Sequence, residues 1–240
     1  MAKHSHARKV AHKKAAEAQK RGQIFSKLTR EIFVAVREGG GPNPETNTRL
    51  RMVIEKAKSF NMPKENIEKA IERASGKTGG ENLEEVIFEG YGPEGIAVIV
   101  EGIVDNKNRA IAEIKNVFSK FGGKVVAEGS IKWMFERKGC VRVPLKEGQT
   151  KEELEMLAIE AGAEDFSWDE NTLEVYTQIE NLQKTKNFFL EKGIEIEQES
   201  IDWVPKNKIT VDTSKKEKIE NFFEALEDLD FVTEIYSNLE

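Results

Sequence analysis

The stretch Gly95-Ile96-Ala97-Val98-Ile99-Val100 decides the fold class, because a short apolar run without charges is typical of a strand buried in a sheet. Beyond it the apolar residues adopt helical spacing, and residues 130–135 then alternate between apolar and polar. The helical set comprises Ala110, Ile111, Ile114, Val117, Phe118 and Phe121. Strand, helix and strand in this order predict one half of a split βαβ, or ferredoxin-like, domain.

A second series of the same kind occupies the middle of the chain. Its predicted strands are 140–143, 173–176 and 194–196, and its predicted helices are 154–161 and 182–189. The C-terminal residues repeat the theme with a strand at 208–211, a helix at 219–229 and a strand at 232–236. Because the C-terminal part can complete the first half-domain, we expect the middle series to be inserted within the outer one.

The first 80 residues are predicted to be helical. Apolar residues recur at helical spacing in the segments 7–18, 24–35, 50–57 and 67–74. Gly22 is expected to kink or break the chain between the first two, and Gly39-Gly40-Gly41-Pro42 ends the second. The predicted fold class is therefore α+β with three domains. These are a basic helical domain at 1–80, a discontinuous ferredoxin-like domain at 81–138 and 206–240, and an inserted ferredoxin-like domain at 139–205.

The net charge of −6 conceals a strong asymmetry along the chain. Residues 1–80 carry 18 Lys and Arg against 8 Asp and Glu, whereas residues 81–240 carry 19 against 35. Such a split is typical of a basic module that faces nucleic acid, joined to an acidic body. The acidic body is expected to position that module or to contact protein.

The candidate nucleic-acid-binding residues lie near the N-terminus. Residues 1–30 hold nine Lys and Arg and a single acid, Glu17, whereas a solvated helix face normally mixes both signs. Closely spaced cations bind phosphates largely through counterion release. The candidates are Lys3, His4, Arg8, Lys9, His12, Lys13, Lys14, Lys20, Arg21, Lys27 and Arg30. Residues 39–47 are either a flexible loop between helices or a backbone that approaches RNA closely.

Several other classes of protein and site are disfavoured. The single cysteine excludes an internal disulfide and a zinc site built on several thiolates. No apolar run approaches a membrane span, and the N-terminus lacks the apolar region of a secretory signal, so a cytoplasmic location is expected. No metal site is expected at the three histidines and no cofactor elsewhere. Trp133, Trp168 and Trp203 are expected to pack in sheet cores.

An enzyme is also disfavoured, because no nucleophile, acid–base pair or nucleotide fingerprint stands out. Ser75-Gly76-Lys77-Thr78 contains the end of a phosphate-loop motif, but Ile71 stands where that motif needs glycine. A cryptic site between the two α/β domains would need convergent titratable groups, which the sequence does not display. A protein–protein scaffold that works through the acidic body is the remaining alternative from another class.

Long, ordered motifs resemble the YebC/PmpR family over essentially the whole chain. They include Met1-Ala2-Lys3-His4-Ser5, Lys20-Arg21-Gly22, Ile24-Phe25-Ser26-Lys27-Leu28, Asn61-Met62-Pro63-Lys64 and Tyr91-Gly92-Pro93. The resemblance implies a helical bundle and two α/β domains, one interrupted by the other, and no enzymatic activity. Members of that family are described as DNA-binding transcriptional regulators. Others are a mitochondrial translational activator of cytochrome c oxidase subunit I and bacterial proteins linked to ribosomes stalled on proline-rich nascent chains.

Two versions of a nucleic-acid-binding regulator therefore stay open. In the first, the protein acts on ribosomal RNA and tRNA during translation, with ribosomal proteins as further partners. In the second, it is a DNA-binding transcriptional regulator. No helix presents Asn, Gln and Arg poised for base edges, which favours backbone contacts with structured RNA over sharp sequence reading.

Overall fold

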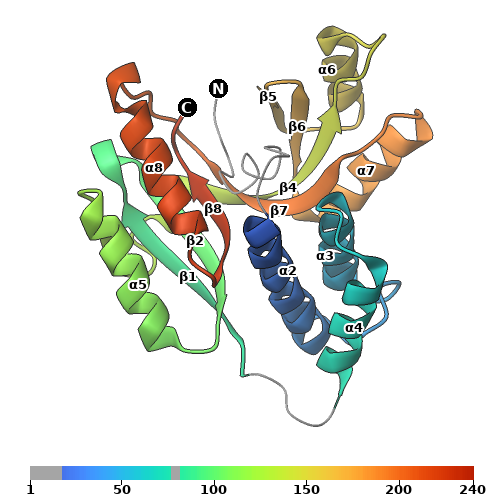
Figure 1. The fold of residues 1–240 in the computed structure, drawn as a ribbon. Helices are drawn as coiled ribbons and strands as arrows, with labels where there is room; N and C mark the ends of the chain where they lie inside the picture. Colours follow the sequence, from blue (N-terminus) through green and yellow to red (C-terminus); the bar gives the residue numbers. More distant parts are fainter. Residues whose placement is uncertain (1–17, 77–81) are drawn as a thin grey trace. The chain divides into compact units, whose positions relative to one another are not determined.

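The computed structural model describes residues 18–76 and 82–240, and they form two compact units (Figure 1). The larger unit contains the described residues up to Lys132 together with Val211–Ser237. The smaller unit contains Trp133–Thr210 and Asn238–Glu240. Each unit has its own four-stranded antiparallel sheet, and the helical part of the chain belongs to the larger unit. This confirms the predicted α+β class, while the boundaries of the three predicted domains stay a prediction.

Three helices make up the helical part of the larger unit. They are α2 (Ala18–Glu38), α3 (Thr48–Ser59) and α4 (Lys64–Ser75). Their shared core contains Leu28 and Ile32 from α2, Leu50 from α3 and Ile67 from α4. The expected kink or break at Gly22 is wrong, because α2 continues through it. A helical glycine costs only about 1 kcal/mol, and the buried stripe that follows it outweighs that cost.

The sheet of the larger unit has the order β3-β1-β2-β8. Its elements are β1 (Glu84–Tyr91), β2 (Ala97–Val104), α5 (Lys107–Lys120), β3 (Lys124–Val126), α8 (Lys216–Glu227) and β8 (Val232–Ser237). The last strand pairs with β2, with Tyr236 opposite Ile99, so the C-terminus completes a sheet that begins before residue 100. This confirms the expected insertion of the middle series within the outer one.

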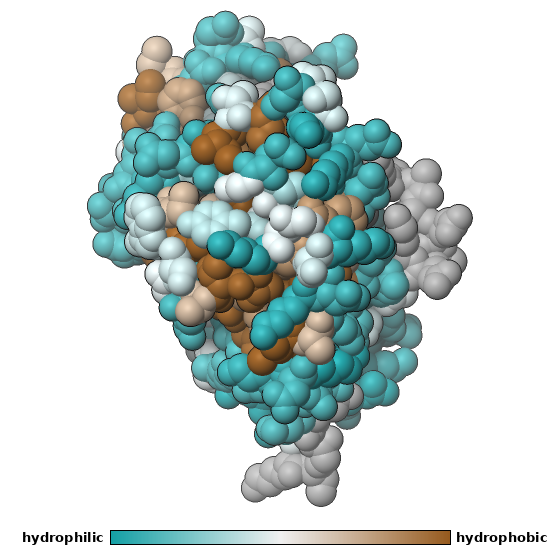
Figure 2. All heavy atoms as spheres, turned by 90° about the vertical axis from the view of Figure 1, so that its left-hand side faces the viewer, coloured by the Kyte–Doolittle hydropathy of each residue, from teal (hydrophilic) through white to brown (hydrophobic). Residues whose placement is uncertain are grey.

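Helices α5 and α8 contact each other beside this sheet. Phe118 of α5 and Phe222 of α8 meet edge to face with their ring centroids 5.0 Å apart. Gly90 of β1 makes room for Phe118, because a Cβ atom there would lie 2.3 Å from that ring. Figure 2 views the side that carries α5 and α8, and hydrophobic areas lie between hydrophilic ones on it.

The sheet of the smaller unit has the order β5-β6-β4-β7. Its elements are β4 (Phe135–Pro144), α6 (Lys151–Glu160), β5 (Asp165–Asp169), β6 (Thr172–Thr177), α7 (Leu182–Glu191) and β7 (Gln198–Pro205). Helix α6 begins with a capping box, in which Thr150 and Glu153 bond to each other's backbone N–H groups. An isolated bridge joins Ile209 to Leu239.

Four expectations from the sequence are wrong in detail. Residues 130–134 form a turn and a short 3₁₀ helix, not a strand, and the strand expected at 194–196 begins only at Gln198. The strand expected at 208–211 is reduced to the bridge at Ile209. Trp133 was expected in a core, but 67% of its surface is exposed.

The turn at 129–132 has a clear physical cause. The buried carboxylate of Glu89 accepts backbone N–H bonds from Gly129 and Ile131, both at 2.6 Å, and from Lys132 at 3.1 Å. These bonds replace the ladder that a strand would have made. Glu89 lies on β1, far away in sequence, so the local alternation could not reveal it.

Candidate nucleic-acid interface

Most of the predicted phosphate contacts precede the described residues. Lys3, His4, Arg8, Lys9, His12, Lys13 and Lys14 lie outside them, and for Lys20 the structure describes only the backbone of α2. The described candidates are Arg21, Lys27 and Arg30, all on α2. Arg21 is exposed, whereas Lys27 and Arg30 are half-buried.

Lys27 already has a partner within the protein. Its ammonium group donates a hydrogen bond to the backbone carbonyl of Glu227, at the end of α8. Burial lowers the pKa of Lys27 to about 8, although the nearby Glu227 carboxylate opposes this shift. A lysine in this position can contact a phosphate only after it leaves the end of α8.

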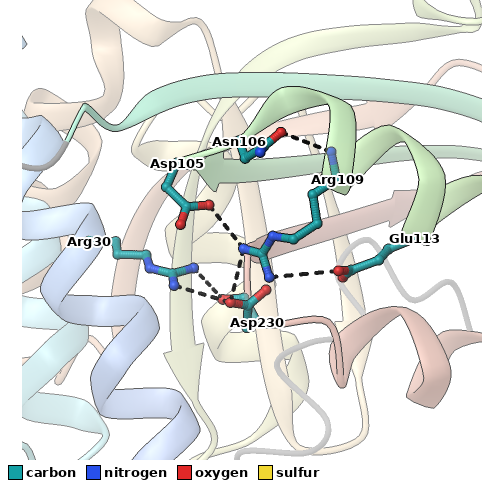
Figure 3. Close-up of polar contacts among 6 residues, drawn as sticks. All are labelled: Arg30, Asp105, Asn106, Arg109, Glu113 and Asp230. Carbon is teal, nitrogen blue, oxygen red and sulfur yellow. Dashed lines mark hydrogen bonds and ion pairs between the residues drawn. The ribbon is translucent and has the colours of Figure 1, made fainter.

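Arg30 is held by the turn between α8 and β8. Its guanidinium donates to the backbone carbonyl of Asp230 at 3.0 Å and to its carboxylate at 3.2 Å. Figure 3 shows that Arg109 of α5 approaches the same carboxylate from the other side, at 3.5 Å. Arg109 also meets Asp105 at 3.0 Å and Glu113 at 3.7 Å, so the two arginines contact three carboxylates between them and share only that of Asp230.

A second ionic cluster, which the sequence did not reveal, joins the helices to the sheet. The ammonium group of Lys56 lies 2.8 Å from Glu31 of α2 and 2.9 Å from Glu234 of β8. Burial acts to lower the pKa of Lys56, but the two carboxylates outweigh it and raise that pKa. Arg49 of α3 forms a further ion pair with Glu85 of β1.

The loop at 39–47 has a defined internal structure. The buried amide of Asn47 donates to the carbonyls of Ala35 at 2.8 Å and Gly41 at 2.7 Å, and its oxygen caps α3 at Leu50. Gly39 allows this closure, because a Cβ atom there would lie 2.4 Å from the Ala35 carbonyl oxygen. A direct contact between this loop and RNA stays a prediction.

Two other exposed cations of the helical part, Lys64 and Arg37, have partners within it. Lys64 and Glu68 of α4 form a pair one turn apart at 3.5 Å. Arg37 donates to the carbonyl of Gly76 at 3.1 Å and stacks over Phe33. These residues resemble an ordinary solvated helix surface. Among the described candidates on α2, Arg21 is therefore the exposed one, whereas Lys27 and Arg30 contact the end of α8 and the turn after it.

Within residues 18–76 and 82–240, no three His, Cys, Asp or Glu side chains are placed to hold a metal ion. In the same residues, no helix is long and apolar enough to cross a membrane. The three histidines lie outside the described residues.

Models of one protein family match both parts of the chain. The model for the TACO1/YebC protein N-terminal domain matches residues 5–77. The model for the TACO1/YebC second and third domain matches residues 83–239. Together they cover the helical part and both sheets.

Relatives of similar length match from end to end. A "probable transcriptional regulatory protein" of Caldanaerobacter subterraneus subsp. tengcongensis is 46% identical over 240 residues, covering 100% of this chain and 98% of that protein. A protein of the same description from Thermotoga maritima is 45% identical, with coverage of 100% and 94%. The crystal structure of a conserved hypothetical protein from Aquifex aeolicus is 46% identical and has a TM-score of 0.86. That match covers 95% of this chain and 93% of the other.

Proposed function

The chain belongs to the TACO1/YebC family, and we propose that it is a non-enzymatic regulator of gene expression that binds nucleic acid through its basic helical part. In this proposal it acts during translation, on ribosomal RNA and tRNA. The observation that carries the proposal is the charge separation between residues 1–80 and the acidic remainder. A surface of one sign recruits a polyanion, whereas the acidic remainder is repelled by it.

The contacts of α2 divide the candidate residues into two groups. Lys27 and Arg30 are bound by the end of α8 and the turn after it. Arg21 and the basic residues before it carry the phosphate contacts in this proposal. They are Lys3, His4, Arg8, Lys9, His12, Lys13, Lys14 and Lys20. Lys27 and Arg30 can join them only by exchanging their protein partners for phosphate.

The choice of structured RNA rests on how the cations are arranged. The helical part offers closely spaced positive charges but no helix with the side chains that read base edges. Backbone-dominated contact of this kind suits a target that is already folded. The alternative is a DNA-binding transcriptional regulator, and the names of the bacterial relatives favour it.

The two versions differ in what changes first when the protein is removed. Ribosome footprints and transcript levels should be measured together in a strain that lacks the protein. The translation version predicts more pausing at defined codons with nearly constant transcripts. It also predicts that the protein sediments with large ribosomal subunits at moderate salt. Altered transcripts with unaltered pausing would overturn it and support the transcription version.

Charge-reversal variants connect that phenotype to the proposed surface. Lys13→Glu combined with Lys20→Glu should fail to restore normal pausing, because both changes add negative charge to the phosphate-binding stretch. Lys58→Glu combined with Lys69→Glu makes the same change at exposed sites on α3 and α4 and is the matched control. Equal rescue by the two double variants would move the contact surface away from the N-terminal stretch.

A further inference from the structure

Trp133 is the most exposed of the large hydrophobic side chains in the part of the chain that the structure describes. It lies in the 3₁₀ turn Lys132–Met134, directly before β4, and 67% of its surface is accessible. Tryptophan brings a larger apolar surface than any other side chain, so an exposed indole is unusual in a folded domain. Such a ring is suited to contact another flat, apolar surface.

Two lysines, Lys206 and Lys208, directly follow strand β7, and the first of them is hydrogen-bonded to this turn. The backbone N–H of Lys206 donates to the carbonyl of Met134 at 2.9 Å, which ties the end of β7 to the turn that carries Trp133. Lys206 and Lys208 are both exposed. In the described part of the chain, neither has an ion-pair partner.

A stacked pair of side chains extends the same region along the two strands. Arg137 of β4 lies opposite Trp203 of β7, and its guanidinium carbon is 5.0 Å from the indole ring centre. Both side chains are half-buried. Cation–π stacking of this kind adds positive charge beside a second aromatic face.

The region stands out from its acidic surroundings. Residues 133–138 and 202–208 carry four Lys and Arg and two Asp and Glu, whereas residues 81–240 carry 19 and 35. Of the two acids, Asp202 is buried and lies beside Arg142. Positive charge next to an exposed indole is the combination that recurs on surfaces for single-stranded nucleic acid.

We propose that Trp133, Lys206 and Lys208 bind an unpaired nucleotide of a single-stranded nucleic acid. The base stacks on the exposed indole, and the two lysines contact phosphates on either side of it. A paired base in a duplex already has neighbours on both faces, so the site selects unpaired nucleotides. This inference rests on the proposed binding of nucleic acid and adds a second contact, in the smaller unit, with its own ligand class.

The test compares unpaired with paired nucleic acid on the full-length protein. Binding of a labelled oligouridylate and of a blunt RNA duplex is measured by anisotropy for the wild type and for Trp133→Ala. The loss of one stacked base should weaken oligouridylate binding roughly 5- to 150-fold and leave duplex binding unchanged. Trp133→Phe should retain most of the affinity, because phenylalanine still offers a ring. A parallel oligothymidylate series shows whether RNA and DNA bind alike.

Further variants separate this site from the N-terminal surface. Lys206→Ala with Lys208→Ala should make the salt slope for oligouridylate shallower by about 1.4, which is 0.7 for each lost phosphate contact. Met156→Ala removes another exposed apolar side chain of the smaller unit, and it should change neither affinity. Unchanged oligouridylate binding in Trp133→Ala, or an equal loss for duplex, overturns the inference while the proposed function stands. A wild-type protein that binds neither RNA nor DNA overturns both.

Discussion

The two sheets have the same four-stranded antiparallel construction, but they bury their ionic side chains in different ways. In the larger unit a largely buried cation is Lys56 of α3, with 13% of its side chain exposed, and its carboxylates come from α2 and β8. In the smaller unit a more deeply buried cation is Arg142 of β4, and its carboxylates are Glu174 of β6 and Asp202 of β7. One cluster joins helices to a sheet, whereas the other lies within a sheet.

The cluster in the smaller unit is the more deeply buried. The carboxylate side chains of Glu174 and Asp202 are 4% and 1% exposed, and Nε of Arg142 donates to Glu174 at 2.8 Å. The hydroxyl of Tyr176 donates to the other oxygen of Glu174 at 2.6 Å. The carboxylates around Lys56 are 14% and 11% exposed. The position of the cation therefore predicts what each cluster stabilises, and the depth of burial predicts by how much.

Removal of Arg142 should give the largest effect. Arg142→Met leaves two carboxylates buried without their cation, and breaking a buried pair in this way costs roughly 3–5 kcal/mol. The smaller unit should then unfold at lower denaturant concentration than in the wild type. Tryptophan fluorescence reports on this unit alone, because Trp133, Trp168 and Trp203 all lie in it.

A control for this variant uses an exposed pair in the same unit. Lys146 and Glu195 approach to 3.0 Å with both side chains more than half exposed. Lys146→Met should change the free energy of unfolding by about 0.5 kcal/mol or less. A similar loss of unfolding free energy in both variants would show that the burial of Arg142 does not increase its contribution to stability.

Removal of Lys56 should give the second-largest loss of stability, and this loss should fall in the larger unit. Lys56→Met leaves Glu31 and Glu234 partly buried without a cation, which should cost roughly 3 kcal/mol. Because the cluster joins α2 and α3 to β8, far-ultraviolet circular dichroism of the helices should show the loss. The tryptophan transition should stay in place, since none of the tryptophans lies in this unit.

An exposed lysine on the same helix serves as the matched control. Lys58→Met, two residues along α3, removes the same charge from an exposed site and should leave both transitions unchanged. If Lys56→Met shifts the tryptophan transition as much as the helical one, the two units unfold together. The two ionic clusters would then not stabilise separate units.

The sequence predicted the elements whose pattern is local. The apolar run at 95–100 lies in β2 and the turn before it, and the helical spacing at 110–121 became α5. Strand β1 was missed, because Glu84, Glu85 and Glu89 interrupt its apolar residues. Glu89 serves a contact that the local pattern cannot show, since it closes the turn at 129–132.

The positive charge of the candidate nucleic-acid interface was predictable from the sequence, but the protein partners of its cations were not. An excess of positive charge near the N-terminus can be read directly from the residues. Which cations have protein partners depends on residues far away in the sequence, such as Glu227 for Lys27 and Asp230 for Arg30. Trp133 was misplaced for the same reason, because the turn that exposes it is set by Glu89.

The contact between α2 and α8 should make the stability of the larger unit depend on pH. Burial raises the pKa of the Glu227 carboxyl to about 8, from an unfolded value near 4.5. The folded protein therefore binds this proton more strongly than the unfolded chain does. The resulting stabilisation is complete below pH 4.5 and is lost as the pH rises to about 8. Lys27, with its pKa lowered to about 8, has the opposite effect between pH 8 and its unfolded value of 10.5.

This is the smallest of the three effects, because Glu227 is only half-buried and solvent screens its charge. One pKa unit corresponds to about 1.4 kcal/mol, and we expect a decline of roughly 1–2 kcal/mol between pH 5 and 8 after screening. Glu227→Gln should remove that decline from the helical transition, since the amide does not titrate. Glu224→Gln, at an exposed site on the same helix, should retain it. If Glu227→Gln keeps the wild-type slope, burial does not raise the pKa of the Glu227 carboxyl in the way that this prediction requires.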